Sequence, residues 1–282
     1  MVFEHKALTY NGKVIFEKLI LGDFKRLPKV FQETEACFMF IEKGSFQFRT
    51  PEKVIHFNSG DGMLAKCGNY FFERAMGQQP ITEEKIKVIG AYFYPAIVKE
   101  LLDYDLSLSD FETDYDTTKI NIDGILLNFI QSIEFLLDNP SVASDSMLLT
   151  KLKEFLLLLA KTESAPSVLD FVSSLYKPYE YNFKTTIENN LFASLSLHEI
   201  ATLCGMSIST FQRKFAKIYS ESPAKYILHK KMEKAKTLLS NKNIRISNVA
   251  YDCGFDAIST FNRSFKKQFG ISPSQFRLNE NE

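Results

Sequence analysis

Residues 204–223 read CGMSISTFQRKFAKIYSESP, and residues 253–273 read CGFDAISTFNRSFKKQFGISP. The two stretches match at an offset of 49 residues before Ala257 and 50 after it, so Ala257 is a single insertion. The match extends upstream, where LSLHEIA (195–201) corresponds to IRISNVA (244–250). Self-similarity at a fixed spacing reveals the unit of architecture. Two copies are too few for a solenoid, so we expect a paired module.

Each copy is typical of two short helices joined by a glycine turn. Ser196 and Glu199 have the spacing of a capping box, which begins a helix. Gly205 suits the turn that follows, because a helix end favours a residue that tolerates positive φ. Ser207 is placed to cap a second helix over residues 208–219. This is the form in which the second helix enters a DNA major groove. We expect two such units, at residues 196–219 and 245–269.

Helical phase separates the core side of the second helix from its outward side. Phe211 and Phe215 lie four residues apart on one face and belong to the core. Arg213 lies about 200° from Phe211 at roughly 100° per residue, so the outward face is polar and positive. A single outward Arg is usually only solvated, and the duplication of the whole face is what indicates DNA binding. The outward or edge residues are Ser209, Gln212, Arg213 and Lys217 in the first copy, and Ser259, Asn262, Arg263, Lys266 and Lys267 in the second.

The stretch between the copies predicts a connector helix. Pro223 begins it, and apolar residues over 224–240 are spaced to pack against both units. Sixteen helical residues span roughly 24 Å, which can set two helices in major-groove segments about one turn apart. We expect a basic outer side that suits phosphates, made of His229, Lys230, Lys231 and Lys234.

The net charge of zero is the sum of a basic C-terminal stretch and an acidic remainder. Residues 183–282 hold 11 Lys and 4 Arg against 8 Asp and Glu, a charge of +7. The other 182 residues hold 19 basic and 26 acidic groups, a charge of −7. A basic module attached to an acidic one suggests a polyanion-binding half and a half with another task. The alternative is a charged face that is merely solvated.

Length and composition favour a two-domain globular protein of 282 residues. No run of about 18 apolar residues exists, and the N-terminus lacks the pattern of a secretory signal. We therefore expect a soluble cytoplasmic protein that makes no contact with a membrane. The four cysteines, at 37, 67, 204 and 253, match no zinc motif, so we expect neither a metal nor any other cofactor.

The first stretch, residues 1–94, is typical of short strands broken by glycine turns. Residues 37–50 alternate apolar and polar around Lys43-Gly44, which predicts a hairpin. Further strands are expected at 54–57 and 86–94, with a turn cluster at 58–63. Such a row favours a small antiparallel β-barrel or roll.

The pattern turns helical over residues 95–176. Helices are expected at 95–104, 124–139 and 145–163. Apolar residues cover more than a narrow stripe of 145–163, so we expect this helix to contact both the barrel and a partner chain in a homodimer. The alternative is core packing alone. The fold class is therefore α+β, with the N-terminal domain at 1–176, a linker at 177–182 and an all-α domain at 183–282.

The stretch 183–278, with GMSISTFQRKF, SPAKYI, VAYDCGF and STFNRSFKKQFGISPSQFR, resembles the DNA-binding domain of AraC/XylS-type transcriptional regulators. The resemblance implies seven helices, two helix-turn-helix units, asymmetric sites on double-stranded promoter DNA, and contact with RNA polymerase in an activator. One departure is Arg245, which stands where Ser196 caps the first copy. The base-reading roles that the resemblance implies fall on Ser209, Gln212, Arg213, Ser259, Thr260 and Arg263.

The N-terminal order of elements is similar to the cupin-like sensor domain, with trailing dimerisation helices, that such regulators often carry. It resembles the branch of type III secretion activators, in which a protein antagonist can replace a small inducer. Whether the effector is a small molecule or a protein stays open, and so does any ligand-binding residue. We expect Phe38, Phe40, Phe46, Phe48 and Phe57 to point partly into the barrel.

Two other functions compete with a dimeric transcription regulator. One is an enzyme, such as an alkyl-transfer repair protein, that uses the same DNA-binding module. Its reactive cysteine would have to be Cys37 or Cys67, and neither has matched ligands nearby in sequence. The other is a barrel whose main work is to bind another protein, with DNA binding switched off by that partner.

Overall fold

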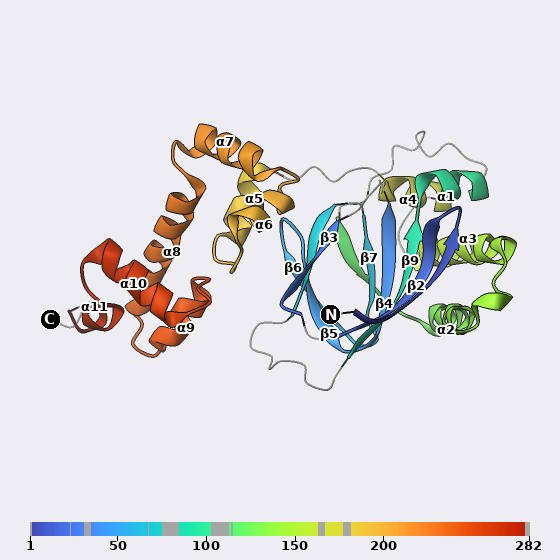
Figure 1. Ribbon diagram of the computed structural model, residues 1–282, viewed down its shortest axis with the longest axis horizontal. Coiled ribbons are helices and arrows are strands. Elements are labelled where there is room, and N and C mark those ends of the chain that lie inside the picture. Colours follow the sequence, from blue (N-terminus) through green and yellow to red (C-terminus); the bar gives the residue numbers. More distant parts are fainter. Residues whose placement is uncertain are drawn as a thin grey trace. The chain divides into compact units, whose positions relative to one another are not determined.

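The chain folds into two compact units, Met1–Glu180 and Tyr181–Glu282, drawn in Figure 1. The computed structural model describes residues 2–22, 24–30, 35–66, 68–74, 85–102, 113, 115–162, 167–176 and 182–279. The linker expected at 177–182 lies outside the described residues except for Asn182. We call the two units the N-terminal unit and the C-terminal unit and describe each by itself.

The strands of the N-terminal unit form two antiparallel sheets. The six-stranded sheet has the order β1-β2-β9-β4-β7-β10, and the four-stranded sheet has the order β3-β8-β5-β6. The first sheet contains β1 (Val2–Tyr10), β2 (Lys13–Leu21), β9 (Ile86–Phe93), β4 (Ala36–Lys43), β7 (Gly62–Ala65) and β10 (Thr117–Ile120). The second contains β3 (Arg26–Val30), β8 (Asn69–Glu73), β5 (Ser45–Arg49) and β6 (Val54–Asn58).

The helices of this unit are α1 (Pro95–Leu102), α2 (Gly124–Asp138), α3 (Asp145–Thr162) and α4 (Val168–Leu175), with a short 3₁₀ turn, η2, at Pro140–Val142. The α+β class is therefore confirmed, and α1, α2 and α3 lie where the sequence predicted helices. Strand β10 lies within the stretch that was expected to be helical only. No helix among the described residues combines the length and apolar character needed to cross a membrane.

The six-stranded sheet is covered on both faces. On one face Phe129 of α2 and Phe155 of α3 pack against sheet residues, with Phe155 4.8 Å from Phe38 between ring centroids. On the other face, Lys29 of β3 donates to the hydroxyl of Tyr92 in β9 at 3.1 Å, which bridges the two sheets. This explains why residues 36–41 of β4 are all buried and do not alternate with exposed ones.

Two expectations for the strands are wrong. The expected barrel is not closed, because β1 and β10 form the edges of one sheet and β3 and β6 the edges of the other. The expected hairpin at Lys43-Gly44 is a corner, where the chain leaves the six-stranded sheet and enters the four-stranded one. Strand β4 pairs with β7 and β9, whereas β5 pairs with β6 and β8. Gly44, at φ +88°, permits the corner.

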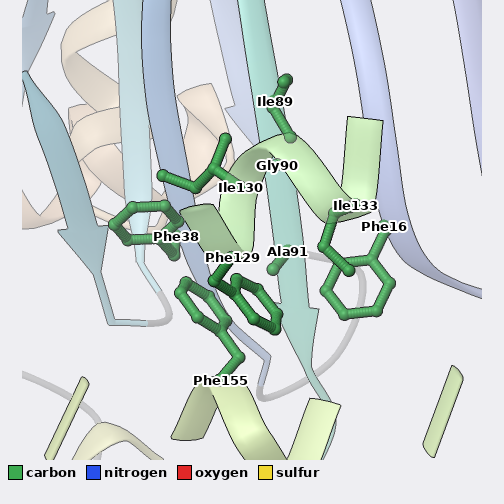
Figure 2. Close-up of a pocket in the computed structure, with 9 residues that line it drawn as sticks. All are labelled: Phe16, Phe38, Ile89, Gly90, Ala91, Phe129, Ile130, Ile133 and Phe155. Atoms are coloured by element: carbon green, nitrogen blue, oxygen red, sulfur yellow. The ribbon is translucent and has the colours of Figure 1, made fainter. Parts of the chain in front are cut away.

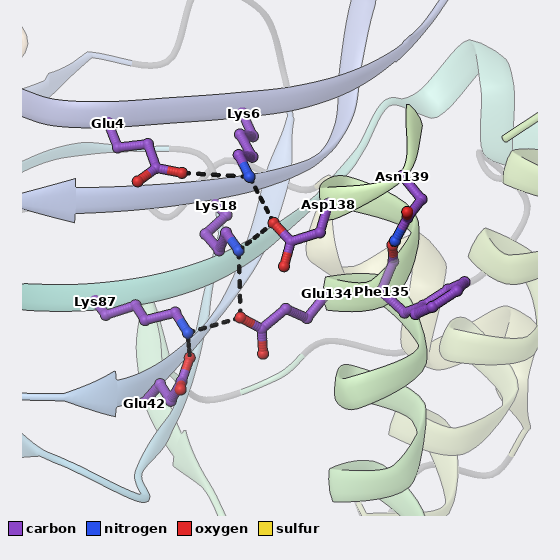
Figure 3. Close-up of polar contacts among 9 residues, drawn as sticks. All are labelled: Glu4, Lys6, Lys18, Glu42, Lys87, Glu134, Phe135, Asp138 and Asn139. Carbon is purple, nitrogen blue, oxygen red and sulfur yellow. Dashed lines mark hydrogen bonds and ion pairs between the residues drawn. The ribbon is translucent and has the colours of Figure 1, made fainter. Parts of the chain in front are cut away.

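Charged side chains attach α2 to the six-stranded sheet, as Figure 3 shows. Lys18 is nearly buried and donates to Asp138 at 2.6 Å and to Glu134 at 3.3 Å. Lys6 reaches Asp138 at 2.6 Å, and Lys87 reaches Glu134 at the same distance. Hydrogen bonds from Lys18 and Lys6 lower the pKa of Asp138 from its ordinary value of 3.8 to about 2.

Acid is expected to weaken this attachment. A carboxylate whose pKa is lowered by folding stabilises the protein above its unfolded pKa, so the contribution of Asp138 is complete above pH 3.8 and is lost as the pH falls toward 2. Because this side chain is 40% exposed, solvent screening limits the contribution to about 1 kcal/mol. Thermal unfolding of wild type and Asp138→Asn between pH 5 and pH 2 should show two melting curves that converge as acid is added. Parallel pH profiles would contradict the assignment.

Seven helices are described in the C-terminal unit, as the family resemblance implies: α5 (Phe183–Asn190), α6 (Leu197–Leu203), α7 (Ile208–Tyr219), α8 (Pro223–Leu239), α9 (Ile246–Asp252), α10 (Ile258–Phe269) and α11 (Pro273–Asn279). We call residues 196–219 the first repeat and residues 245–269 the second repeat. Each repeat is a helix-turn-helix with its own hydrophobic core.

The connector helix α8 belongs to both cores. Ile227 lies in the core of the first repeat, while Met232, Ala235 and Leu239 lie in that of the second. This confirms that the connector packs against both repeats. Leu228 of the same helix is also apolar, but it is 37% exposed and belongs to neither core.

Candidate nucleic-acid interface

Helix α7 is positioned by the local signals in the first repeat. The capping box at the start of α6 is present, since Ser196 Oγ accepts from the Glu199 amide at 3.2 Å and Glu199 Oε2 accepts from the Ser196 amide at 2.7 Å. Gly205 makes the turn at φ +65°. Ser207 Oγ then accepts from the Thr210 amide at 3.3 Å and begins α7. The predicted caps of the first repeat are therefore confirmed.

Helix α10 is positioned with fewer local contacts. The residues that precede α9 and α10, Arg245 and Ala257, make no side-chain cap hydrogen bond. The second repeat therefore depends more on packing than on caps. Its inward rings, Phe261 and Phe265, are fully buried, as are Phe211 and Phe215 in the first repeat.

The side of each second helix that lies opposite its buried rings is exposed. Arg213 and Lys217 of α7 make no ion pair with any residue that the structure describes, and the same holds for Arg263, Lys266 and Lys267 of α10. These five charges are therefore available to phosphate or base atoms. All ten residues singled out from the sequence are exposed: Ser209, Gln212, Arg213, Lys217, Ser259, Thr260, Asn262, Arg263, Lys266 and Lys267. The Ser209 hydroxyl lies 3.1 Å from that of Ser207, so it also supports the cap.

The basic outer side expected on α8 is only partly present. Lys231 and Lys234 donate to backbone carbonyls of the second repeat. Burial lowers the pKa of Lys231, in keeping with an inward ammonium group. Lys230 and His229 share Glu233, at 3.4 and 3.7 Å. Sequence periodicity missed the inward lysines because their acceptors lie about 20 residues away in the chain.

The cysteines of the C-terminal unit behave as compact apolar residues. Cys253 is fully buried in the second core, and Cys204 packs against the first. Burial raises the pKa of Cys204 to about 12 and that of Cys253 to about 11. Within the described part of the chain, no group of three His, Cys, Asp or Glu side chains could hold a metal ion.

The five phenylalanines expected inside the N-terminal domain are all buried. Phe46, Phe48 and Phe57 pack on one another in the four-stranded sheet. Phe38 faces the helices instead, at the apolar pocket of Figure 2, which also lies against Phe129 and Phe155. Its empty volume of about 200 Å³ includes space that is open to solvent. The pocket identifies no effector site.

Comparison with known proteins places these features in a family. A helix-turn-helix domain model matches residues 200–279, and the ExsA N-terminal regulatory domain model matches residues 36–171. The virulence regulon transcriptional activator VirF of Yersinia enterocolitica is 26% identical over 259 residues, covering 89% of this chain and 92% of its own. The transcriptional activator AarP of Providencia stuartii is 35% identical over 94 residues, covering 33% of this chain and 70% of its own.

The chain also resembles solved structures. Fatty-acid-bound ToxT of Vibrio cholerae shares 16% identity at a TM-score of 0.40, covering 95% of this chain and 97% of its own. The two repeats with exposed polar helices, together with the two domain models and the relative VirF, define a DNA-binding transcription regulator with an N-terminal regulatory region. The chain belongs to the AraC/XylS family of helix-turn-helix transcriptional regulators.

Proposed function

We propose that this regulator reads two successive major-groove segments of promoter DNA, one with α7 and the other with α10. In this proposal Arg213 and Arg263 read bases, while Lys217, Lys266 and Lys267 neutralise phosphates. The remaining contacts to bases or nearby phosphates come from Ser209, Gln212, Ser259, Thr260 and Asn262. Because promoter DNA is its partner, we place the protein in the cytoplasm.

One observation carries the proposal. Two helices in one compact unit present the same residue pattern, with two buried Phe rings on one side and an exposed Arg on the other. An exposed Arg on a single helix is ordinary, but a matched pair with unpaired charges fits two grooves of one duplex.

Arg213→Ala and Arg263→Ala should each weaken binding to a preferred duplex by about 1–3 kcal/mol and relax the base preference at one position. The reason is that an Arg side chain can donate two hydrogen bonds to the edge of a guanine. The measurement starts from duplexes that the full wild-type chain selects from a random-sequence pool. Each variant is then titrated against the selected site and single-base changes of it.

Lys267→Ala is the matched control for base reading. Loss of a phosphate contact should weaken binding to all duplexes alike and reduce the slope of log affinity against log salt by about one. If the Arg variants also lost affinity uniformly across sequences, the division between base reading and phosphate contact would be wrong. If the wild-type chain enriched no sequence, the two-groove proposal would fail as a whole.

We further infer that the N-terminal unit controls DNA binding through an effector and joins two copies through residues 145–163. The match to a regulatory domain supports control by this unit, with either a small molecule or a protein as the effector. Several relatives are named as activators, which supports activation through contact with RNA polymerase.

The dimer contact is tested on α3, which keeps apolar side chains exposed. Met147 is 37% and Leu157 42% exposed, while Leu152 and Leu156 of the same helix are fully buried. Replacing Met147 and Leu157 together by Lys should convert a dimer into a monomer in light-scattering measurements, because charges would be desolvated in the contact. Leu278→Lys in α11, at an exposed apolar residue of the C-terminal unit, is the control. An unchanged mass in the α3 variant would refute this contact.

We propose no catalytic activity. The enzyme alternative needs a reactive thiolate, and burial raises the pKa of Cys37 to about 12. Cys67, the other candidate, lies outside the described residues.

A further inference from the structure

The glycine turns of the two repeats differ in their surroundings. Gly205 is exposed, whereas Gly254, at the same place in the second repeat, is buried. A Cβ atom added to Gly254 would lie 2.3 Å from the carbonyl oxygen of Phe192. Phe192 follows α5 and packs against the core of the first repeat. The turn of the second repeat therefore lies directly against the backbone of Phe192, a residue that packs on the core of the first repeat.

Two lysines of the connector helix α8 lie next to this contact between the Gly254 turn and Phe192. Lys231 Nζ donates to the Gly254 carbonyl at 2.8 Å, and Lys234 Nζ donates to the Asp252 carbonyl at 2.7 Å. The Asp252 carbonyl lies in the last turn of α9, where helix geometry leaves acceptors without a partner inside the helix, and the Gly254 carbonyl lies in the turn that follows. Positive charges are favourable at this end, since the helix dipole is negative there.

The same two ammonium groups also contact aromatic rings. Lys234 Nζ lies 4.0 Å from the centre of the Phe192 ring, and Lys231 Nζ lies 5.3 Å from that of Phe255. Phe192 packs with the first core and Phe255 with the second. Lys234 therefore joins the end of α9 to a side chain that packs on the core of the first repeat, and both lysines lie on α8, which connects the two repeats.

We propose that Lys231 and Lys234 form a clamp that fixes the second repeat against the first and so sets the spacing at which α7 and α10 meet DNA. We call this pair the lysine clamp. Its members are positioning residues, since they contact protein atoms and act on DNA only through the placement of the repeats. The functional half of this inference rests on the proposal that both helices read one duplex.

If the clamp holds the two repeats in place, the affinity of the protein for DNA should depend strongly on the distance between the two half-sites. One inserted base pair rotates the second half-site by about 35° and moves it by about 3.4 Å. The wild-type chain cannot follow without breaking the clamp, so the insertion should lower its affinity at least about tenfold. Without the clamp, the second repeat can shift, and the penalty for the insertion should fall to about threefold or less.

The first experiment uses the full chain and a duplex that the wild type selects from a random-sequence pool. Affinity is measured for that duplex and for versions with one or two base pairs inserted between the half-sites. The test protein is Lys231→Met/Lys234→Met, because Met keeps much of the apolar stem and removes the donor. The control is Lys236→Met, which removes a charge from the exposed side of the same helix.

The second experiment needs no DNA. Spin labels are attached to ketone-bearing residues placed at Ile218 of α7 and Gln268 of α10, both at exposed positions. The wild type and the Lys236→Met control should give one narrow distance distribution, and the clamp variant a broad one.

The outcomes separate the clamp from the two-groove proposal. A broad distribution in the clamp variant, together with a reduced insertion penalty, supports the inference. An equally narrow distribution in all three proteins overturns it. So does an affinity loss in the clamp variant that matches Lys236→Met at every spacing. If the distances broaden while the wild type tolerates every insertion, the clamp stands and the proposal that both repeats read one duplex fails.

Discussion

Phe155→Ala is expected to destabilise the N-terminal unit by about 3–5 kcal/mol. The Phe155 ring is 1% exposed and lies where α3, α2 and the six-stranded sheet meet. It stacks on Phe129 at 4.8 Å and 2°, meets Phe38 edge-on at 4.8 Å, and lies 5.8 Å from Phe93. Removal would enlarge the pocket beside it and take away contacts from three elements at once.

Denaturant unfolding followed by circular dichroism measures this cost, since the protein has no Trp for fluorescence. Phe135→Ala is the matched control, because this ring on α2 is 62% exposed. The control should change stability by no more than about 0.5 kcal/mol. Similar losses in both variants would show that Phe155 does not join the helices to the sheet.

Gly254→Ala should be the most damaging single change in the C-terminal unit, at about 3 kcal/mol or more. The new Cβ would lie 2.3 Å and 2.7 Å from the carbonyl oxygen and carbon of Phe192. Both are backbone atoms, so no side-chain rotation relieves the clash. The φ of +74° adds strain for any residue with a Cβ.

Gly205→Ala separates the clash with Phe192 from the strain of a positive φ. Its φ of +65° brings similar strain, but the position is exposed, so we expect a cost of about 1–2 kcal/mol. The difference between the two variants in unfolding free energy reports the contact between the repeats. Equal costs would mean that the close contact between Gly254 and Phe192 adds nothing to the cost of the Gly254→Ala substitution. Affinity for a selected duplex should follow the same order.

The helices were predictable because their signals are local. The Ser196 capping box, the Ser207 cap and the glycine turns act over three or four residues, and the structure contains all of them. Strand pairing is not local. A glycine at positive φ suits a hairpin and a corner between sheets equally, so the alternation around Lys43-Gly44 suggested the wrong partner for β4. A tight hairpin does exist at Asn11-Gly12, where both residues have positive φ and β1 pairs with β2.

The outward faces of α7 and α10 were predictable for a related reason. Once Phe211 and Phe215 are assigned to the core, the 3.6-residue period determines which residues are exposed. The inward orientation of the Lys231 and Lys234 side chains was not predictable, because it depends on where the end of α9 lies relative to α8. A run of basic residues on a connector resembles a phosphate-binding surface until its acceptors are known.

The division of α8 between two cores matters for anyone who recombines such proteins. In the sequence, Pro223 looks like a suitable boundary for a chimera. A chimera with its boundary at Pro223 would, however, take Ile227 of the first core together with Met232, Ala235 and Leu239 of the second. The segment to exchange should begin inside the helix, after Ile227 and before Lys231. Each core then keeps the residues that α8 contributes to it, and Lys231 and Lys234 stay in the same segment as the turn at Gly254. A donor segment with this boundary should replace the second repeat without repacking the first.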